Sequence, residues 1–204
     1  MPEIPTSHNL FEDNGIKFFN KDGQKFSAEL EKRIESKLTQ DMVAVDSINL
    51  GKASRMSDAQ GRYIEFCKST FLDLDLSVLS ILLDCANGAT YSVAPKDFEE
   101  LGAVVNTIGS SPDGININQN CGSTSPEFLK DEITKGKYDI GIAFDGDGDR
   151  ILIITSDGDI LDGDDILYIL SQKLLKGSGV VGTLMTNKAL EIYFEEKNIN
   201  FLRA

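Results

Sequence analysis

The chain has 204 residues, enough for one large or two small domains, and its 33 acidic and 20 basic residues give a net charge of −13. Nucleic acid and anionic membranes bind polyanions poorly unless a local basic patch exists, and the sequence has none, so we expect neither partner. No apolar run reaches transmembrane length and no signal peptide is recognisable, which predicts a cytoplasmic protein. Three widely spaced cysteines, Cys67, Cys85 and Cys121, match no zinc motif and are typical of buried thiols in a reducing compartment.

A compact polar motif follows the proline-containing start of the chain. Ser7, His8 and Asn9 are adjacent, and Lys17 lies ten positions after the serine. A serine beside a histidine, with a lysine nearby, offers a nucleophile and two candidate proton carriers. A polar loop that caps a strand is the alternative, and the pattern alone leaves it open.

Two helices and a linker are predicted between this motif and residue 71. Apolar residues spaced four apart behind a serine cap indicate an amphipathic helix over Ser27–Leu38. A short strand, Val43–Ile48, and a linker, Asn49–Ser57, place the first domain boundary near residue 50. The next helix runs from about Asp58 to Phe71, and we expect it to bury three side chains: Tyr63, Phe66 and Cys67.

From residue 78 onward strands and helices alternate. The predicted strands are Val78–Leu83, Ala103–Ile108 and Tyr138–Phe144, and the predicted helices are Val93–Leu101 and one that begins with Ser125 as its cap and Pro126 in its first turn. This order predicts an α/β fold with a mixed, mostly parallel sheet and crossover helices. Sites in such sheets lie at the carboxyl ends of strands, where the Asp84–Gly88 turn and the segment after Phe144 both fall.

The segment after Phe144 is the most informative part of the chain. Asp145, Asp147 and Asp149 alternate with glycines, whose backbone freedom lets the three carboxylates converge. Converging oxygen ligands select a hard cation such as Mg²⁺ or Ca²⁺, and Arg150 adds a forked donor suited to phosphate. An acidic hairpin turn before the strand Ile151–Thr155 is the alternative. An EF-hand is excluded, because its sixth and twelfth positions would be arginine and serine instead of glycine and glutamate.

A further unit closes the chain. A helix marked by three leucines, a strand over Val180–Leu184, a helix capped by Asn187 and a strand starting at Asn200 are predicted. We therefore expect three parts: residues 1–50, 51–160 with the acidic segment, and 161–204.

The pairing of Ser7-His8-Asn9 and Lys17 with the acidic segment Asp145–Arg150 resembles the α-D-phosphohexomutases. Four stretches are most similar to the bacterial branch of that family that acts on glucosamine phosphates: Phe11–Phe19, Gly61–Phe66, Asp84–Ala89 and Cys121–Thr124. The resemblance implies that the chain holds the end of the family's domain 1, all of domain 2 and the beginning of domain 3.

The resemblance also implies a role for each candidate residue. Ser7 would be phosphorylated and, with Asp145, Asp147 and Asp149, would bind one Mg²⁺; Asn9 and Arg150 would bind phosphate; His8 and Lys17 would carry protons. The implied reaction interconverts glucosamine 6-phosphate and glucosamine 1-phosphate through a bisphosphate, with a hexose 1,6-bisphosphate as activator. Glucose or mannose phosphates, and a non-catalytic domain that binds a divalent metal, remain as alternatives.

The sequence departs from the family pattern at several points. Leu10 stands where the family usually has proline, and Pro5 and Thr6 replace the small pair that usually precedes the serine. The family's sugar-selecting loop and C-terminal phosphate loop do not occur, so we expect the 204 residues alone to be inactive. A small phosphosugar is the expected partner, and a homodimer is an open option.

Overall fold

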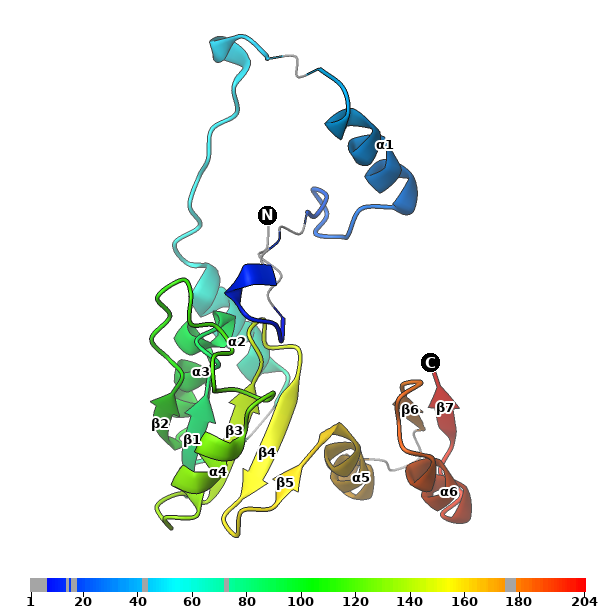
Figure 1. The fold of residues 1–204 in the computed structure, drawn as a ribbon. Helices are drawn as coiled ribbons and strands as arrows, with labels where there is room; N and C mark the ends of the chain where they lie inside the picture. Colours follow the sequence, from blue (N-terminus) through cyan, green and yellow to red (C-terminus); the bar gives the residue numbers. More distant parts are fainter. Residues whose placement is uncertain (1–6, 14, 16–17, 42–43, 72–73, 175–178) are drawn as a thin grey trace.

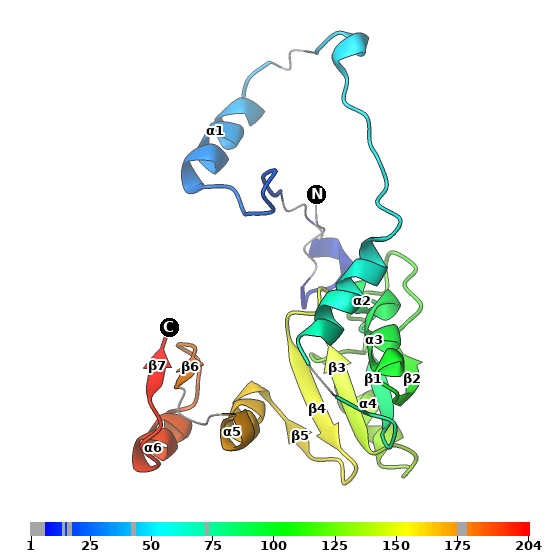
Figure 2. The same ribbon diagram turned by 180° about the vertical axis from the view of Figure 1, so that it is seen from behind.

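A computed structural model describes residues 7–13, 15, 18–41, 44–71, 74–174 and 179–204. Its centre is a five-stranded sheet, with α2 and α3 on one face and α4 on the other (Figures 1 and 2). The strands are β1 Ser80–Asp84, β2 Val104–Ile108, β3 Ile140–Phe144, β4 Ile151–Thr155 and β5 Ile160–Leu161. The helices against this sheet are α2 Ala59–Ser69, α3 Ala94–Glu100 and α4 Glu127–Ile133.

Alternation along β1 explains why helices cover both faces of the sheet. Ile81 and Leu83 belong to the core cluster on the α3 side, whereas Leu82 packs with Leu129 and Ile133 of α4. Successive strand residues point to opposite faces, so an almost continuously apolar strand needs two covering layers. Each of these buried aliphatic side chains contributes about 1.5–3 kcal/mol to folding.

The strand order, β2-β1-β3-β4-β5, confirms the predicted mixed sheet. β1 pairs in parallel with β2 and β3, whereas β4 pairs antiparallel with β3 and β5. The carboxyl ends of β1 and β3 therefore meet at one edge of the sheet. Both the Asp84–Gly88 turn and the residues after Phe144 leave from that edge.

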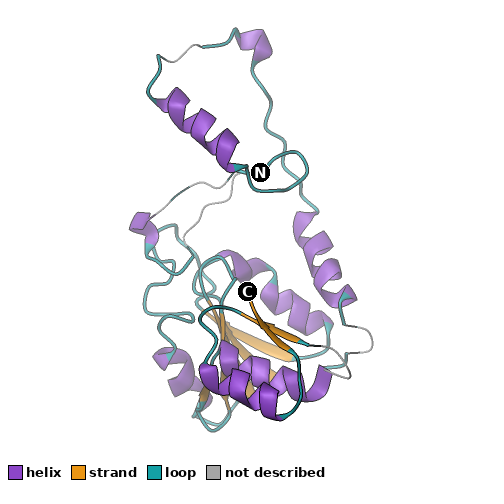
Figure 3. Cartoon of the chain, turned by 90° about the vertical axis from the view of Figure 1, so that its right-hand side faces the viewer, coloured by secondary structure: helices purple, strands orange, loops and turns teal. Residues whose placement is uncertain are grey.

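The short helix η1 Phe11–Asp13 lies next to the end of the sheet, whereas the following part of the chain, with α1 Ala28–Leu38 and η2 Ser47–Asn49, extends away from it (Figures 1 and 3). Ser27 caps α1 as predicted, since its Oγ accepts the Leu30 N–H at 3.3 Å. α1 buries none of its residues.

The C-terminal part forms a separate two-stranded parallel sheet of β6 Val180–Gly182 and β7 Phe201–Arg203. The remaining helices are α5 Gly163–Leu174 and α6 Lys188–Glu196, the latter capped by Asn187 as predicted. Arg203 holds the turn after β6: its guanidinium donates to the carbonyls of Thr183, Leu184 and Thr186 and pairs with Glu191 at 2.8 Å. No helix in the described ranges is both long and apolar enough to span a membrane.

Three local predictions were wrong. The described part of Val43–Ile48 contains no strand; its end enters η2, and Val45 and Ile48 are exposed, because no partner strand lies beside them. In α2 the buried residue is Ile64, whereas Tyr63 and Phe66 are exposed and Cys67 is half-buried.

The third concerns α4. Its cap is Pro126 and not Ser125, and no side chain caps the helix, because the turn that begins at Gly122 extends through Ser125.

Candidate active site

The acidic loop, Asp145–Arg150, connects β3 to β4 in a hairpin. Phe144 pairs with Ile151 across the two strands, so the loop closes directly on the ladder. Ligand oxygens of Asp145, Asp147 and Asp149 lie within 4.8 Å of one another. The predicted hairpin turn and the candidate metal site are therefore the same loop and do not exclude each other.

Two glycines determine how the acidic loop is built and where it packs. Gly148 has φ +75°, in the left-handed region that disfavours side chains. Gly88, in the turn after β1, lies so close that a Cβ there would come within 2.2 Å of the Gly146 carbonyl oxygen. Next to it the Ala89 N–H donates to that same oxygen at 2.8 Å. The strand-end turn thus packs directly against the acidic loop.

The three carboxylates differ in their surroundings. Asp145 is fully buried and accepts the Arg150 N–H at 3.0 Å, whereas Asp149 is exposed. Desolvation, followed by the charges of Asp147 and Asp145, raises the pKa of Asp149, and Arg150 opposes that rise. The Arg150 Nε lies 3.9 Å from Asp145 and 4.0 Å from Asp149, at the rim of the cluster. Carboxylate repulsion of this kind is relieved by a divalent cation, and the all-oxygen donor set fits one.

Ser7 lies against this cluster although it is 138 residues away in sequence from Asp145. Its Oγ donates to Asp145 Oδ2 at 3.0 Å, and its carbonyl oxygen accepts the Gly146 N–H at 2.7 Å. His8 Nδ1 lies 3.5 Å from the Ser7 Oγ, at the outer limit of a hydrogen bond. Figure 1 shows η1, which follows these residues, above the end of β3 where the acidic loop begins.

Two other candidate site residues, Asn9 and Lys17, do not take part in the contact between Ser7 and the acidic loop. The side chain of Asn9 is exposed, and the contact that the structure gives for this residue is made by its carbonyl oxygen. Lys17, the second candidate proton carrier, lies outside the described residues.

Comparisons with known proteins decide the family. Models of three domains of phosphoglucomutase/phosphomannomutase match this chain: domain I over residues 3–44, domain II over residues 61–158 and domain III over residues 162–204. The chain belongs to the α-D-phosphohexomutase family.

Two sequence relatives of this phosphohexomutase chain have the same name. A phosphoglucosamine mutase from Marinomonas sp. (strain MWYL1) is 53% identical over 206 residues, and one from Cronobacter sakazakii is 52% identical. Each match covers 98% of this chain and 46% of the relative, so the chain spans about half the length of these proteins.

Solved structures are similar in fold. A phosphoglucomutase/phosphomannomutase family protein from Burkholderia thailandensis superposes with a TM-score of 0.73 at 24% identity, covering 98% of this chain and 43% of that chain. The phosphoglucomutase parafusin from Paramecium gives a TM-score of 0.69 at 18% identity, covering 98% and 44%. At these identities the likeness concerns the fold alone.

Sequence reasoning missed two residues that support the candidate site from outside it. Asn118 donates to the carbonyl oxygens of Ser7 and Asn9, and the fully buried Asp84 accepts the N–H groups of Ala86 and Gly122. Burial raises the pKa of Asp84 in spite of these two bonds. Asp84 could have been found from its position at the end of β1, because sites in such sheets lie at the carboxyl ends of strands. Asn118 lies in a loop in which no sequence motif is recognisable.

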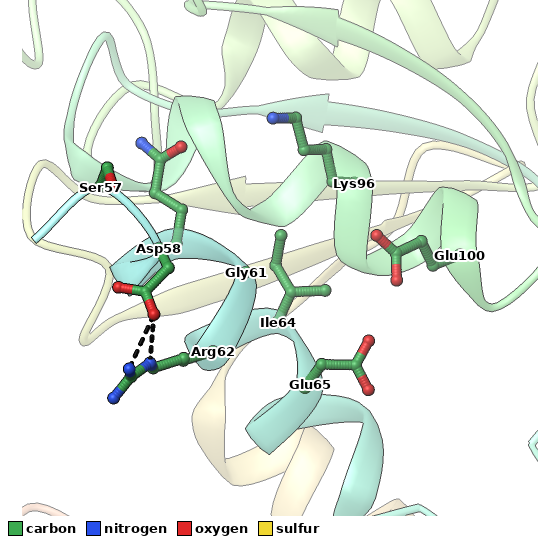
Figure 4. A pocket seen from close by; sticks show the side chains of 9 residues that line it. Ser57, Asp58, Gly61, Arg62, Ile64, Glu65, Lys96 and Glu100 are labelled. Carbon is green, nitrogen blue, oxygen red and sulfur yellow. Dashed lines mark hydrogen bonds and ion pairs between the residues drawn. The ribbon is translucent and has the colours of Figure 1, made fainter.

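One pocket near the phosphohexomutase sheet is separate from this chemistry. A cavity of about 650 Å³ lies between α2 and α3, and none of its lining residues belongs to the acidic loop (Figure 4). Asp58 and Arg62 at its mouth pair with each other at 2.7 Å, and Glu65 and Glu100 both pair with Lys68. Its charges are largely neutralised, so it does not resemble a phosphate site.

Proposed function

We propose that this chain carries the phosphoserine and metal-binding part of a phosphoglucosamine mutase, which interconverts glucosamine 6-phosphate and glucosamine 1-phosphate. The observation that carries the proposal is the 3.0 Å hydrogen bond from Ser7 Oγ to Asp145 Oδ2. It joins a hydroxyl nucleophile to a cluster of three carboxylates across 138 residues. The names of relatives at 52–53% identity support glucosamine phosphate as the substrate.

The acidic loop would bind Mg²⁺. Asp145, Asp147 and Asp149 supply oxygens from one loop, and Ser7 adds a fourth position at its edge. When bound, the ion would neutralise charge on a phosphoryl group held by Ser7. Arg150 lies at the rim of the same cluster, where its guanidinium would bind phosphate oxygens, and Asn9 would bind them from the serine side.

The residues around Ser7 would move one phosphoryl group and one proton. In the first half-reaction the bond between Ser7 Oγ and phosphorus breaks while a sugar hydroxyl oxygen bonds to that phosphorus. The hydroxyl proton passes by way of His8 or Lys17 to the freed Ser7 Oγ, and the product is a sugar bisphosphate. In the second half-reaction Ser7 Oγ takes the other phosphoryl group and the proton returns. A hexose 1,6-bisphosphate would phosphorylate an unmodified Ser7 and leave as a monophosphate.

We also propose that residues 1–50, 51–160 and 161–204 belong to three successive domains. Matches to domain models over residues 3–44, 61–158 and 162–204 support this division. A phosphosugar partner follows from the proposed reaction, and a cytoplasmic location would fit it. The homodimer stays a prediction.

The test is transfer of a phosphoryl group to Ser7. The chain is incubated with Mg²⁺ and either glucosamine 1,6-bisphosphate or glucose 1,6-bisphosphate, and Ser7 is followed by peptide mass spectrometry, with Ser7→Ala as the control. We expect phosphorylation at Ser7 in the wild type and none at this peptide in Ser7→Ala. Metal binding without any phosphorylation would favour the non-catalytic domain.

A further inference from the structure

We propose that Asn118 is a positioning residue that fixes the serine loop, residues 7–13, on the acidic loop. Its importance for catalysis rests on the proposed function, whereas its anchoring role rests on geometry alone. The proposal assigns it no contact with substrate: it acts on the backbone on both sides of His8, and through that backbone on the direction of the Ser7 hydroxyl.

The side-chain nitrogen of Asn118 is fully used by the serine loop, whereas its Oδ1 is buried and has no hydrogen-bond partner among the described residues. Its Nδ2 donates to the carbonyl oxygen of Ser7 at 3.0 Å and to that of Asn9 at 2.8 Å. An amide nitrogen has two hydrogens, so these two contacts use both. Asn118 is only 5% exposed, and hydrogen bonds shielded from water are stronger than exposed ones.

These bonds act on the carbonyl group nearest to the chemistry. The Ser7 carbonyl also accepts the Gly146 N–H at 2.7 Å, so it is held by the acidic loop on one side and by Asn118 on the other. With its carbonyl fixed twice, Ser7 has its Oγ directed at Asp145. Asn118 carries no charge, so its hydrogen bond to the Ser7 carbonyl does not depend on whether the Ser7 side chain bears a phosphoryl group.

Asn118 is itself fixed from below. Its backbone N–H donates to the Ala86 carbonyl at 2.8 Å, in the turn that follows β1. The N–H of Ala86 in turn donates to the buried Asp84 carboxylate at 3.0 Å. The Asn118 side chain is therefore supported by the end of β1, whose last four residues are all buried.

The backbone conformation narrows the choice of residue at this position. Asn118 has φ +57°, in the left-handed region that glycine and asparagine enter most easily. Glycine would keep this conformation but has no amide, and aspartate would keep the shape but has no donor at neutral pH. Asparagine meets both requirements.

The experiment compares Asn118→Gly and Asn118→Asp with a matched control, Asn120→Gly. Asn120 lies in the same loop at φ +54° and is exposed, and its side chain makes no hydrogen bond with any described residue. Three quantities are measured on the full chain: hydrogen exchange of the amides of residues 8–13, Mg²⁺ affinity, and the rate of Ser7 phosphorylation by a hexose 1,6-bisphosphate.

Both Asn118 variants should exchange faster at residues 8–13 and lose at least about tenfold in phosphorylation rate, because the nucleophile is no longer held in line. Mg²⁺ affinity should fall only modestly, because the three carboxylates stay in place while the Ser7 oxygen is no longer held beside them. Exchange in β1 and β3 should remain that of the wild type, and Asn120→Gly should match the wild type throughout. Asn118→Asp should be no better than Asn118→Gly, since its carboxylate would face two carbonyl oxygens.

Each other outcome counts against a different claim. Wild-type exchange at residues 8–13 in Asn118→Gly would overturn the anchoring role. A loss of protection in β1 and β3 as large as that at residues 8–13 would also overturn it, because Asn118 would then support the fold in general. If the wild type itself is never phosphorylated while the exchange result holds, the proposed function fails and the anchor stands.

Discussion

Asp84 shows how a single residue supports the site without belonging to it. It ends β1, is fully buried, and accepts the Gly122 N–H at 2.7 Å and the Ala86 N–H at 3.0 Å. A Cβ on Gly109, which has φ +55°, would come within 2.5 Å of its Oδ1. One carboxylate thus holds the turn after β1 and two points of the loop between β2 and α4.

Replacing Asp84 with asparagine should destabilise the chain by roughly 1–3 kcal/mol at neutral pH, because one of the two N–H groups would then face an amide donor. The loss should depend on pH. Burial raises the pKa of Asp84 above its unfolded value, so the folded chain takes up a proton as the pH falls through that raised pKa. The wild type should therefore gain stability relative to Asp84→Asn as the pH falls from neutral toward the unfolded pKa of aspartate.

Urea unfolding of both proteins at several pH values measures this difference. A constant difference across that range would mean that the pKa of Asp84 is not raised.

At the residue scale, the sequence was informative where spacing carries the chemistry. Glycines between Asp145, Asp147 and Asp149 predicted the converging carboxylates, which the structure brings together. Asn118 could not be found in this way, because its partners are carbonyl oxygens more than a hundred residues earlier in the chain. Backbone contacts of this kind leave no pattern in side-chain identity.

At the scale of elements, the site depends on the fit between two strand-end segments. The Asp84–Gly88 turn after β1 and the acidic loop after β3 touch at Gly88 and Gly146, where there is no room for a methyl group. Gly88 has φ −106° and ψ −163°, which any residue can adopt. Glycine is therefore required here for space and not for conformation.

Gly88→Ala should force the turn and the acidic loop apart, lowering the unfolding free energy by about 1–3 kcal/mol. It should also weaken Mg²⁺ binding, since the loop that holds the three carboxylates must move. The matched control is Gly61→Ala in α2, where a Cβ would meet no atom within 4 Å. That change should stabilise the helix by up to about 1 kcal/mol and leave the metal affinity unchanged.

Urea unfolding and calorimetric titration with Mg²⁺ measure both effects. Wild-type metal affinity in Gly88→Ala would show that the two loops do not need to touch.

Elements were predictable when burial imposed a pattern on them. β1, β3 and α3 are covered by packing partners, and their sequences show the corresponding apolar runs or spacing. The predicted strand over Val43–Ile48 failed because β-branched residues indicate a strand only where a second strand can pair with them. The face of α2 was misassigned because its aromatic residues are exposed while Ile64 packs inward.

At the scale of the whole molecule, the described residues form two sheets that share no strand. The acidic loop belongs to the five-stranded sheet, whereas β6 and β7 pair with each other. A ligand that binds only the folded form of one unit stabilises that unit by mass action. The position of the metal site can therefore be read from the part of the chain that Mg²⁺ protects.

We expect Mg²⁺ at a hundred times its dissociation constant to stabilise the five-stranded sheet against unfolding by about 2.7 kcal/mol. Amides that exchange through unfolding of the sheet should then exchange roughly a hundredfold more slowly. Amides of β6 and β7 should be unaffected. Asp147→Asn should remove the protection while leaving the circular dichroism spectrum unchanged. Hydrogen exchange measured by mass spectrometry provides the data, and equal protection of both sheets would contradict a site confined to the acidic loop.

The central claim is that Ser7 and the three aspartates form one metal site. The most direct measurement uses the chain with phosphoserine incorporated genetically at position 7 and Mn²⁺ in place of Mg²⁺. Electron–nuclear double resonance should then show a ³¹P coupling typical of a phosphate oxygen bound directly to the metal, and Asp147→Asn should weaken or abolish metal binding. Mn²⁺ bound at the acidic loop without any ³¹P coupling would contradict the claim, because the serine would then lie beside the metal site without belonging to it.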